Sequence, residues 1–400
     1  MNILIINCGS SSLAFKVFQV ENDEDASLIL TGKARNVATR TQAQPEITWT
    51  FNGTQFSRKC PLPTHREAAE EMWTVLNECG VLIDAAGHRF VHGGKIFNAT
   101  TLINKRSLED LKTVLPLAPI HNPNSFSIIE VCLAHLPGKA QFVVFDTAFH
   151  AKMPVEAREY ALPRDLAARF DLRKYGFHGL SYQYVSAKAA ALLDKPLEQV
   201  KLILCHLGTG GSSVCAFMNG HSIETSMGYS PLAGLVMSTR CGDIDAEVAL
   251  ELIRRGMTAD EVDQVLNYQS GLIGLSGYSS NLEEVIAAAE AGNEDCRIAY
   301  EVYAQRLKHY LGAYTWHLNG PDAIVFTDDI GVSSWKLREK VCSGVERLGI
   351  LIDSQLNQHL PINQPAFFHQ NGSLTKLLVL PTDEEAVILE EVLKNLRSTN

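Results

Sequence analysis

Two segments of this sequence share one pattern, and that pattern limits the fold more than any other feature. Residues 2–6 form a short apolar run, Cys8-Gly9-Ser10-Ser11-Ser12 follows, and an alternating apolar pattern resumes over residues 13–20. A second apolar run at residues 202–205 leads into a glycine- and serine-rich segment, and the apolar pattern resumes over residues 214–218. Each segment predicts a strand, a turn and a second strand. The repetition predicts two related α/β domains.

The remaining sequence alternates strand-like and helical segments, which is typical of α/β proteins. Residues 66–79 have helical spacing, and buried strands are expected at 142–145 and 323–326. Thr382, with Glu385 three residues later, has the spacing of a capping box and predicts a final amphipathic helix. A chain of 400 residues is too long for one ordinary core, which agrees with two domains.

Charge and cysteine content argue against several classes of protein. The formal net charge of −10 disfavours nucleic acid or an anionic membrane as a partner. No apolar run reaches the roughly 18 residues that a membrane span needs, and the N-terminal sequence lacks the basic start of a signal peptide. The nine cysteines are scattered, without a C-x-x-C pair, which favours a reduced, cytoplasmic protein.

The two glycine- and serine-rich turns are candidate phosphate sites. Such turns let backbone N–H groups point at an anion without a Cβ in the way, and hydroxyl groups add donors. Most such turns bind no ligand, but here each directly follows a buried strand. The sequence has no P-loop pattern and no complete G-x-G-x-x-G, which disfavours the common nucleotide-binding folds. The candidate residues in the turns are Ser10, Ser12, Gly208, Thr209 and Gly210.

Two arginines and three histidines stand in positions that favour an anion site. Arg89 lies in an apolar, strand-like run, and Arg240 lies in a tight turn before a helix. An arginine in such a place needs an anion or a carboxylate. A buried ion pair, with Asp146 or Asp243 for example, is therefore the alternative for each. A lone histidine beside glycine or proline is more often structural, but three of them together with two arginines favour a phosphate site; these are His121, His178 and His206.

Several long motifs occur in order along almost the whole chain. The first is Asn7-Cys8-Gly9-Ser10-Ser11-Ser12-Leu13, and the second is Thr225-Ser226-Met227-Gly228 with Pro231-Leu232 and Thr239-Arg240-Cys241-Gly242-Asp243-Ile244-Asp245. These motifs resemble the two signatures of the acetate kinase family. The resemblance extends over residues 88–94, 118–123, 145–150, 175–181, 206–213 and 382–385.

The resemblance implies the actin-like, ribonuclease H-like fold of the sugar kinase, Hsp70 and actin superfamily. Two duplicated α/β domains would then enclose an active-site cleft. The N-terminal domain would span residues 1–147 and be completed by a C-terminal helix over 384–400, and the second domain would span 148–383. The resemblance also implies a homodimeric phosphotransferase that interconverts acetate, or another short-chain carboxylate, with acetyl phosphate, using Mg²⁺ or Mn²⁺.

Roles follow from the resemblance, position by position. Arg89 and Arg240 would hold the phosphoryl group and the carboxylate, and His178 would stabilise the transferring phosphoryl group. Asp146 would orient groups near the carboxylate, while Asn7 and Glu384 would organise the metal ion; Asn7 and His206 would also contact phosphate. The apolar pocket for the acyl methyl group would consist of Val91, Ile120, Phe177 and Pro231.

The sequence departs from the family at the positions that usually contact adenosine. Nucleotide-using members have Gly-Gly-Ile-Gly-Glu-Asn, and this chain has Asp328-Asp329-Ile330-Gly331-Val332-Ser333. The usual Asp-Phe-Arg is Asn281-Leu282-Glu283, and Ala14 replaces a usual lysine. A carboxylate about 4 Å from a nucleotide phosphate would cost about 1–4 kcal/mol in a solvated cleft. Drift in a tolerant loop is the alternative explanation.

These departures, with the acyl and phosphoryl positions intact, resemble the members of the family that use pyrophosphate. The sequence therefore favours acetyl phosphate plus phosphate and acetate plus pyrophosphate as the substrate pairs. The first alternative is an ordinary ATP/ADP-dependent acetate or propionate kinase. The second, from another class, is an inactive protein that binds acetyl phosphate. A sugar kinase is disfavoured, because the predicted acyl pocket has no polar site for a sugar.

Overall fold

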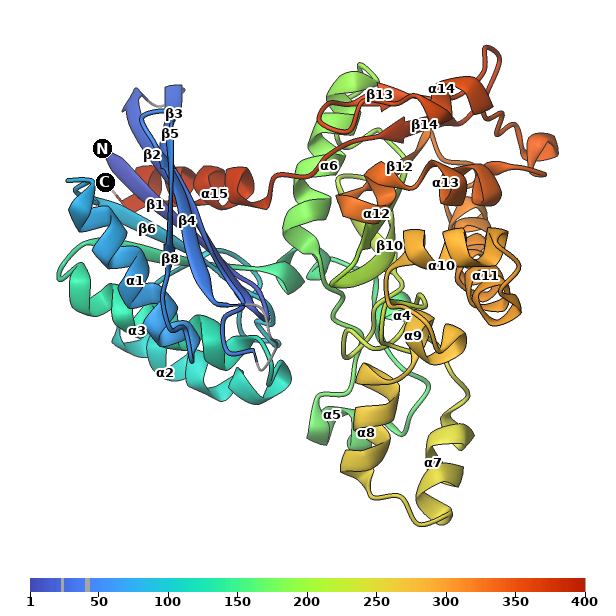
Figure 1. Cartoon of the computed structure of the whole chain (residues 1–400), viewed down its shortest axis with the longest axis horizontal. Helices are drawn as coiled ribbons and strands as arrows, with labels where there is room; N and C mark the ends of the chain where they lie inside the picture. Colours follow the sequence, from blue (N-terminus) through green and yellow to red (C-terminus); the bar gives the residue numbers. More distant parts are fainter. Residues whose placement is uncertain (23–24, 40–43, 400) are drawn as a thin grey trace. The chain divides into compact units, whose positions relative to one another are not determined.

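The computed structural model describes residues 1–22, 25–39 and 44–399, and the chain forms two compact units (Figure 1). Unit 1 comprises Met1–Phe149 and Asp383–Asn400, and unit 2 comprises His150–Thr382. The expectation from the sequence placed these boundaries after residues 147 and 383. No helix in the described residues is long and apolar enough to cross a bilayer.

Unit 1 is built on an eight-stranded sheet in the order β5-β4-β3-β2-β1-β6-β8-β7. β1 is antiparallel to β2 and parallel to β6, and β6 is parallel to β8. The strands are β1 (Asn2–Cys8), β2 (Ser12–Asn22), β3 (Asp25–Arg35), β4 (Glu46–Phe51), β5 (Thr54–Lys59), β6 (Ala85–Phe90), β7 (Thr101–Leu102) and β8 (Ala140–Phe145).

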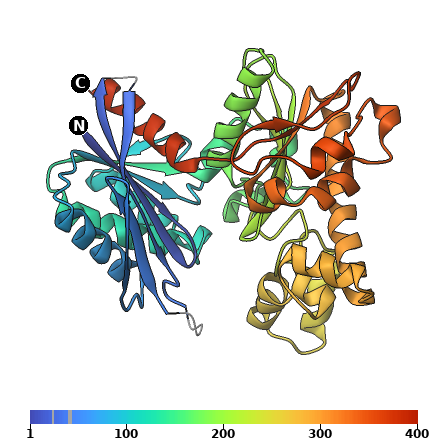
Figure 2. The same cartoon turned by 45° about the horizontal axis from the view of Figure 1, so that its top comes forward.

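Helices cover both faces of this sheet. Leu4 and Ile6 of β1 pack with α1 (His65–Glu78) and α3 (Asn122–His135) in one core cluster. On the opposite face α15 (Glu384–Thr399) approaches β6 so closely that a Cβ on Gly87 would strike Ile388 and Val392. Burial on both faces explains the unbroken apolar run of β1. Figures 1 and 2 show α15 in red along the sheet; the remaining elements are α2 (Lys105–Thr113), η1 (Leu115–Leu117) and η2 (Asp146–His150).

Unit 2 contains a six-stranded sheet in the order β11-β10-β9-β12-β14-β13. β9 is antiparallel to β10, which is antiparallel to β11, while β9, β12 and β14 are mutually parallel along the sheet. Five strands of unit 1, β3-β2-β1-β6-β8, have the same order and directions. The predicted duplication is therefore confirmed. The strands are β9 (Leu202–Gly208), β10 (Gly211–Met218), β11 (His221–Thr225), β12 (Ala323–Thr327), β13 (Ala366–Phe367) and β14 (Lys376–Val379).

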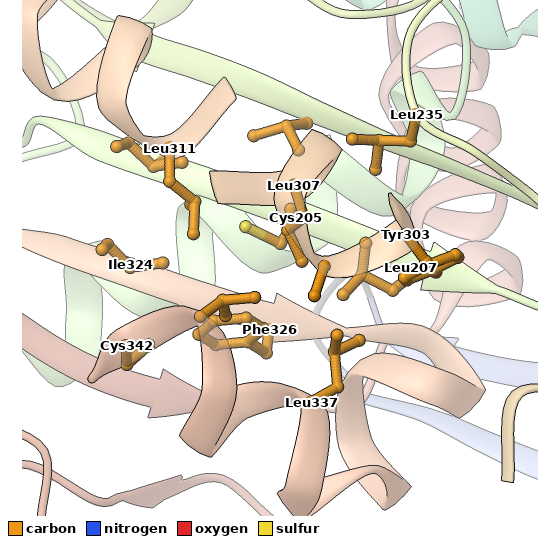
Figure 3. Packing of buried hydrophobic residues seen from close by; sticks show 14 of the residues in the cluster. Cys205, Leu207, Leu235, Tyr303, Leu307, Leu311, Ile324, Phe326, Leu337 and Cys342 are labelled. Carbon is orange, nitrogen blue, oxygen red and sulfur yellow. The ribbon is translucent and has the colours of Figure 1, made fainter. Parts of the chain in front are cut away.

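The core of unit 2 lies between this sheet and a long helix, α11 (Glu294–His317) (Figure 3). Cys205 and Leu207 of β9 face Tyr303 and Leu307 of α11 in this cluster. α6 (Gly179–Leu192) contacts β9 and β12 as well. The other helices are α4 (Val155–Arg158), α5 (Arg164–Phe170), α7 (Ala246–Arg254), α8 (Ala259–Tyr268), α9 (Gly271–Ser276), α10 (Leu282–Glu290), α12 (Asp328–Ser333), α13 (Trp335–Cys342), η3 (Glu346–Leu348) and α14 (Ser354–Gln358).

The structure corrects the predicted turns and the predicted cap. Only residues 9–11 and 209–210 lie between the paired strands, because the flanking glycine and serine residues join the strands themselves. The capping box at Thr382 is wrong. Asp383 caps α15 by accepting the N–H of Ala386 at 3.1 Å, and in the described part of the chain the Thr382 hydroxyl is buried without a partner.

Candidate active site

The side chains expected from the sequence fall into two clusters, one in each unit. The Arg89 cluster of unit 1 comprises Asn7, Arg89, Asp146, Glu384 and Glu385. Asn7 lies near the end of β1, Arg89 near the end of β6, and Asp146 directly after β8. These three neighbouring strands are parallel, so their carboxyl ends meet at one edge of the sheet. That topology brings together residues far apart in the sequence.

Arg89 is the centre of this cluster. Its Nε and Nη2 donate to the two carboxylate oxygens of Asp146 at 3.0 and 2.7 Å. Its Nη1 donates to Asn7 Oδ1 at 2.9 Å and lies 3.0 Å from Glu384 Oε2. Burial by itself would lower the pKa of the guanidinium. The negative charges of Asp146 and Glu384 outweigh that effect, so the pKa is raised. The ion pair that the sequence left open for Arg89 is therefore present, and it fixes the position of this arginine.

The Arg89 cluster continues into a second ion-pair group. Asn7 Nδ2 donates to Glu384 at 3.0 Å and to Glu385 at 2.8 Å. Lys16 lies 3.2 Å from both Glu385 and Asp383. Glu385, which the sequence assigned to a capping box, is thus part of the cluster instead. Sequence reasoning missed it because the i, i+3 spacing from Thr382 had a simpler explanation.

The charges of this cluster fit a divalent cation. The four carboxylates Asp146, Asp383, Glu384 and Glu385 face two cations, Arg89 and Lys16, which leaves two formal negative charges. In the described residues, no three His, Cys, Asp or Glu side chains are arranged to hold a metal ion by themselves. Mg²⁺ commonly binds through one or two carboxylates and completes its shell with water and substrate phosphates. Asn7, Glu384 and Glu385 supply oxygen atoms of that kind.

Two of the predicted acyl-pocket residues also lie in unit 1. Val91, directly after β6, is buried, whereas Ile120, in the turn before α3, is 39% exposed. Asn122 joins the two segments: its Oδ1 accepts the N–H of His92, and its Nδ2 donates to the His92 carbonyl at 3.0 Å. The structure therefore places Val91 and Ile120 on adjoining segments.

The His178 cluster of unit 2 comprises His178, Ser213, His206, Asp328 and Arg240. His178 begins α6 in the left-handed region, with φ of 60°. Such a backbone costs a residue other than glycine about 1–3 kcal/mol and is concentrated at functional sites. The His178 Nδ1 lies 2.7 Å from Ser213 Oγ, and its ring stacks on His206 with centroids 4.0 Å apart. His206 Nε2 in turn lies 3.1 Å from Asp328.

Arg240 points to the same place as His178. Its Nη1 and the His178 Nε2 each lie 3.4 Å from the position that a Cβ on Gly211 would occupy. Burial lowers the pKa of Arg240. Within the described residues no carboxylate lies within 4.0 Å of its guanidinium. The ion pair with Asp243, which the sequence left open as an alternative for Arg240, is wrong, because Asp243 binds Arg306 and Tyr310 instead.

A half-buried, partly desolvated cation such as Arg240, without a carboxylate partner, is unfavourable unless an anion satisfies it. The position beside Gly211, between Arg240 and His178, is therefore the best anion site in unit 2. Gly211 was not among the predicted residues. Its place in the sequence, directly after Gly210 in the glycine-rich segment, could have identified Gly211 as a candidate. Nothing in the sequence shows which side chains would surround it.

The turn between β9 and β10 has a different partner from the one predicted. The backbone N–H and the hydroxyl of Thr209 donate to the Asp329 carboxylate at 2.9 and 2.5 Å. Asp328 lies so close to Gly208 that a Cβ there would strike its carboxylate. Gly210 has open space around it. The carboxylates of α12 thus occupy donors that the sequence assigned to phosphate.

The other predicted residues of unit 2 have structural contacts. Asn281 caps α10 by accepting the N–H groups of residues 283 and 284, Leu282 is buried in the core, and Glu283 lies in the first turn of that helix. The Gly331 carbonyl accepts from Arg338 at 2.9 Å.

The remaining two acyl-pocket residues lie in unit 2, whereas Ser10 lies in the first turn of unit 1 and Ser12 is the first residue of β2. Phe177 is buried and Pro231 is half-buried. Their segments adjoin, because the Gly228 carbonyl accepts the N–H groups of Tyr175 and Gly176. Ser10 is exposed and Ser12 half-buried.

The fold and these clusters define a two-domain α/β protein of the actin-like class. The sequence model of the acetokinase family matches residues 2–390. The chain belongs to this family. It is 41% identical to the acetate kinase of Dictyoglomus turgidum, over 98% of this chain and 97% of that one.

Solved structures agree with that assignment. The acetate kinase of Porphyromonas gingivalis superposes with a TM-score of 0.89 at 34% identity, covering 99% of both chains. The acetate kinase of Entamoeba histolytica gives 0.88 at 38% identity, over 98% of this chain and 99% of that one. A propionate kinase of Francisella tularensis gives 0.88 at 36% identity, covering 98% of both chains.

Proposed function

We propose that this chain is a phosphotransferase that interconverts a short-chain carboxylate, acetate being favoured, with its acyl phosphate. The observation that carries the proposal is the convergence of Arg240 and His178 beside Gly211, with no carboxylate on Arg240 in the described residues, in a member of the acetokinase family. The names of the relatives, acetate kinase and propionate kinase, agree with a carboxylate as the acceptor.

The proposed chemistry is direct, in-line phosphoryl transfer. A carboxylate oxygen attacks phosphorus, and the bond between phosphorus and the leaving oxygen of the donor breaks. Such a transition state spreads negative charge over the equatorial oxygens and needs positioned cations and donors rather than a protein nucleophile. Arg240 and His178 supply these in unit 2. Asp146 holds Arg89 in place in unit 1 through two hydrogen bonds.

Mg²⁺, bound through Asn7 and Glu384 with Glu385 beside them, would neutralise charge on the transferring phosphates. The two excess negative charges of the Arg89 cluster support this assignment. Val91, Ile120, Phe177 and Pro231 would line the pocket for the acyl methyl group, which selects chain length by only about 1–3 kcal/mol per methylene.

ATP and ADP are the phosphoryl donor and acceptor that the comparisons favour, because the relatives are named acetate kinase and propionate kinase, without mention of another donor. Pyrophosphate and phosphate are the second candidate pair, and one specific observation favours them. Asp329 already binds the N–H and the hydroxyl of Thr209, so a nucleotide phosphate at this turn would have to displace a carboxylate. Pyrophosphate is shorter than a nucleoside triphosphate and would leave this carboxylate in place.

The test uses purified protein with acetyl phosphate and Mg²⁺, with ADP in one vessel and inorganic phosphate in another. ³¹P NMR follows the products. ATP formed only with ADP supports the nucleotide pair, and pyrophosphate formed only with phosphate supports the second pair. If acetyl phosphate is consumed in neither vessel but still binds to the protein, the chain is the inactive binding protein and the proposal is refuted. The homodimer expected from the resemblance and the cytoplasmic location expected from the cysteines stay predictions, and sedimentation tests the first.

A further inference from the structure

Behind the ring of His178 lies a buried pair of hydroxyl groups. The Nδ1 of His178 lies 2.7 Å from Ser213 Oγ, and the hydroxyl of Tyr182 lies 2.5 Å from the same oxygen. Ser213 and Tyr182 are both fully buried, on β10 and α6 respectively. The three groups therefore form one continuous hydrogen-bonded row that ends at the imidazole.

Two elements of secondary structure build this row. Tyr182 lies one turn after His178 on α6, and its N–H donates to the His178 carbonyl at 3.0 Å. Side chains four residues apart lie on the same face of a helix. Ser213 pairs with His206 across β9 and β10, so the side chains of Ser213 and His206 lie on the same face of the sheet. The row depends on the fold rather than on one flexible loop.

The direction of the row follows from Tyr182. Burial strongly raises the pKa of the Tyr182 phenol, so this hydroxyl keeps its proton and can donate it. A phenol is more acidic than an aliphatic alcohol and is the stronger donor, so Tyr182 donates to Ser213 Oγ in the arrangement that we infer. Ser213, having accepted from Tyr182, donates to Nδ1 of His178. A neutral imidazole whose Nδ1 accepts carries its proton on Nε2.

Nε2 is the atom that faces the anion site. It lies 3.4 Å from the position of a Cβ on Gly211, as does Nη1 of Arg240. An N–H there would donate to a phosphoryl oxygen, whereas the other tautomer would present a lone pair to an anion. We propose, on the basis of the function proposed above, that Ser213 and Tyr182 are positioning residues. They hold His178 as the Nε2–H tautomer, so that the neutral ring donates to a phosphoryl oxygen bound by Arg240.

The first test measures the tautomer directly. Protein labelled with ¹⁵N in histidine is recorded across a pH series by long-range ¹H–¹⁵N correlation, and His178 is assigned from the signals missing in His178→Asn. We expect the neutral wild-type ring to be protonated at Nε2. A ring protonated at Nδ1 would overturn the proposal. This readout needs no turnover, and the tautomer is measured in protein whose hydrogen-bonded row is unaltered.

Two variants then test the positioning role. Ser213→Ala and Tyr182→Phe are expected to raise the Nδ1–H fraction of His178 and to lower kcat by about 10²–10³-fold, the loss typical of one preorganised donor. KM for the acyl phosphate is expected to change less than kcat. An unchanged tautomer in both variants would overturn the proposal.

The chain offers a matched control on the same strand. Ser212 and Tyr303 are also buried, and their hydroxyls lie 3.4 Å apart, away from His178. Ser212→Ala and Tyr303→Phe are expected to leave the His178 tautomer unchanged. The expected tautomer without turnover of acyl phosphate would support the row and refute the proposed function; turnover with the Nδ1–H tautomer would refute the row alone.

Discussion

The two arginines proposed for the active site should respond in opposite ways to the same substitution. Arg89 binds Asp146 twice and lies 3.0 Å from Glu384, and these side chains are 16%, 1% and 13% exposed. Arg89→Met would leave buried carboxylates without their cation. Breaking a buried pair in this way costs about 3–5 kcal/mol. In a domain of this size each kcal/mol of lost unfolding free energy lowers Tm by about 2–4 °C, so the Tm of unit 1 should fall by about 6–20 °C.

Arg240→Met should not destabilise unit 2. Arg240 is a desolvated cation that no carboxylate compensates in the described residues, so its removal relieves an unfavourable burial. We expect the free energy of unfolding to stay constant or to rise by about 1 kcal/mol, which corresponds to a Tm increase of about 2–4 °C. Activity should be lost in both variants, since both arginines belong to the proposed site.

Calorimetry and urea unfolding of the two variants measure these changes. Arg254→Met is the control, because Arg254 is exposed and pairs on the surface, and it should change stability by no more than about 0.5 kcal/mol. Inorganic phosphate at about 100 times its Kd should stabilise the wild type by about 2.7 kcal/mol and should not stabilise Arg240→Met. A loss of 3 kcal/mol or more in Arg240→Met, by the reference value for a broken buried pair, would refute the reasoning and show that this arginine is a structural ion-pair partner.

Three further changes test other parts of the structure. Gly211→Ala would place a Cβ 3.4 Å from both Arg240 and His178, so activity should fall at least about tenfold while Tm stays within about 2 °C of the wild type; full activity would show that the position is empty during turnover. Asp383→Ala removes the cap of α15 and should cost about 0.5–2 kcal/mol in urea unfolding, whereas Thr382→Ala should not. Burial lowers the pKa of His88 and of His150 to about 4, and the unfolded value is about 6.5, so the unfolded chain binds more protons between these values. Stability should therefore be complete above pH 6.5 and fall as the pH is lowered, by about 1.4 kcal/mol per pH unit for each histidine; His88→Gln should reduce that slope, and an unfolding free energy that is constant from pH 6.5 to 5 would contradict the reasoning.

The part of the site that depends on strand order could be predicted from the sequence. Asn7 and Asp146 each stand at the end of a strand-like run and Arg89 lies within one, and parallel neighbouring strands bring their carboxyl ends together. The duplication was likewise visible as two repeats of strand, turn and strand, whereas the five-strand order came only from the structure.

The contacts between side chains of distant elements could not be predicted in this way. Asp329 and Thr209 are 120 residues apart, and nothing in either segment shows that a carboxylate would bind the donors of the turn. Asp383 and Thr382 are both good capping residues, so the sequence alone could not choose between them. Ser213 was read as part of a turn, and only the register of β10 shows that its hydroxyl meets His178.

The central claim is that the protein joins a carboxylate oxygen directly to phosphorus. Acetate labelled with ¹⁸O in both carboxylate oxygens, incubated with the protein, Mg²⁺ and either ATP or pyrophosphate, tests it by ³¹P NMR of the acetyl phosphate formed. Direct transfer predicts ¹⁸O in the bridge between carbon and phosphorus, seen as an isotope-shifted ³¹P signal. Acetyl phosphate with an unlabelled bridge, or no acetyl phosphate with either donor, would contradict the account.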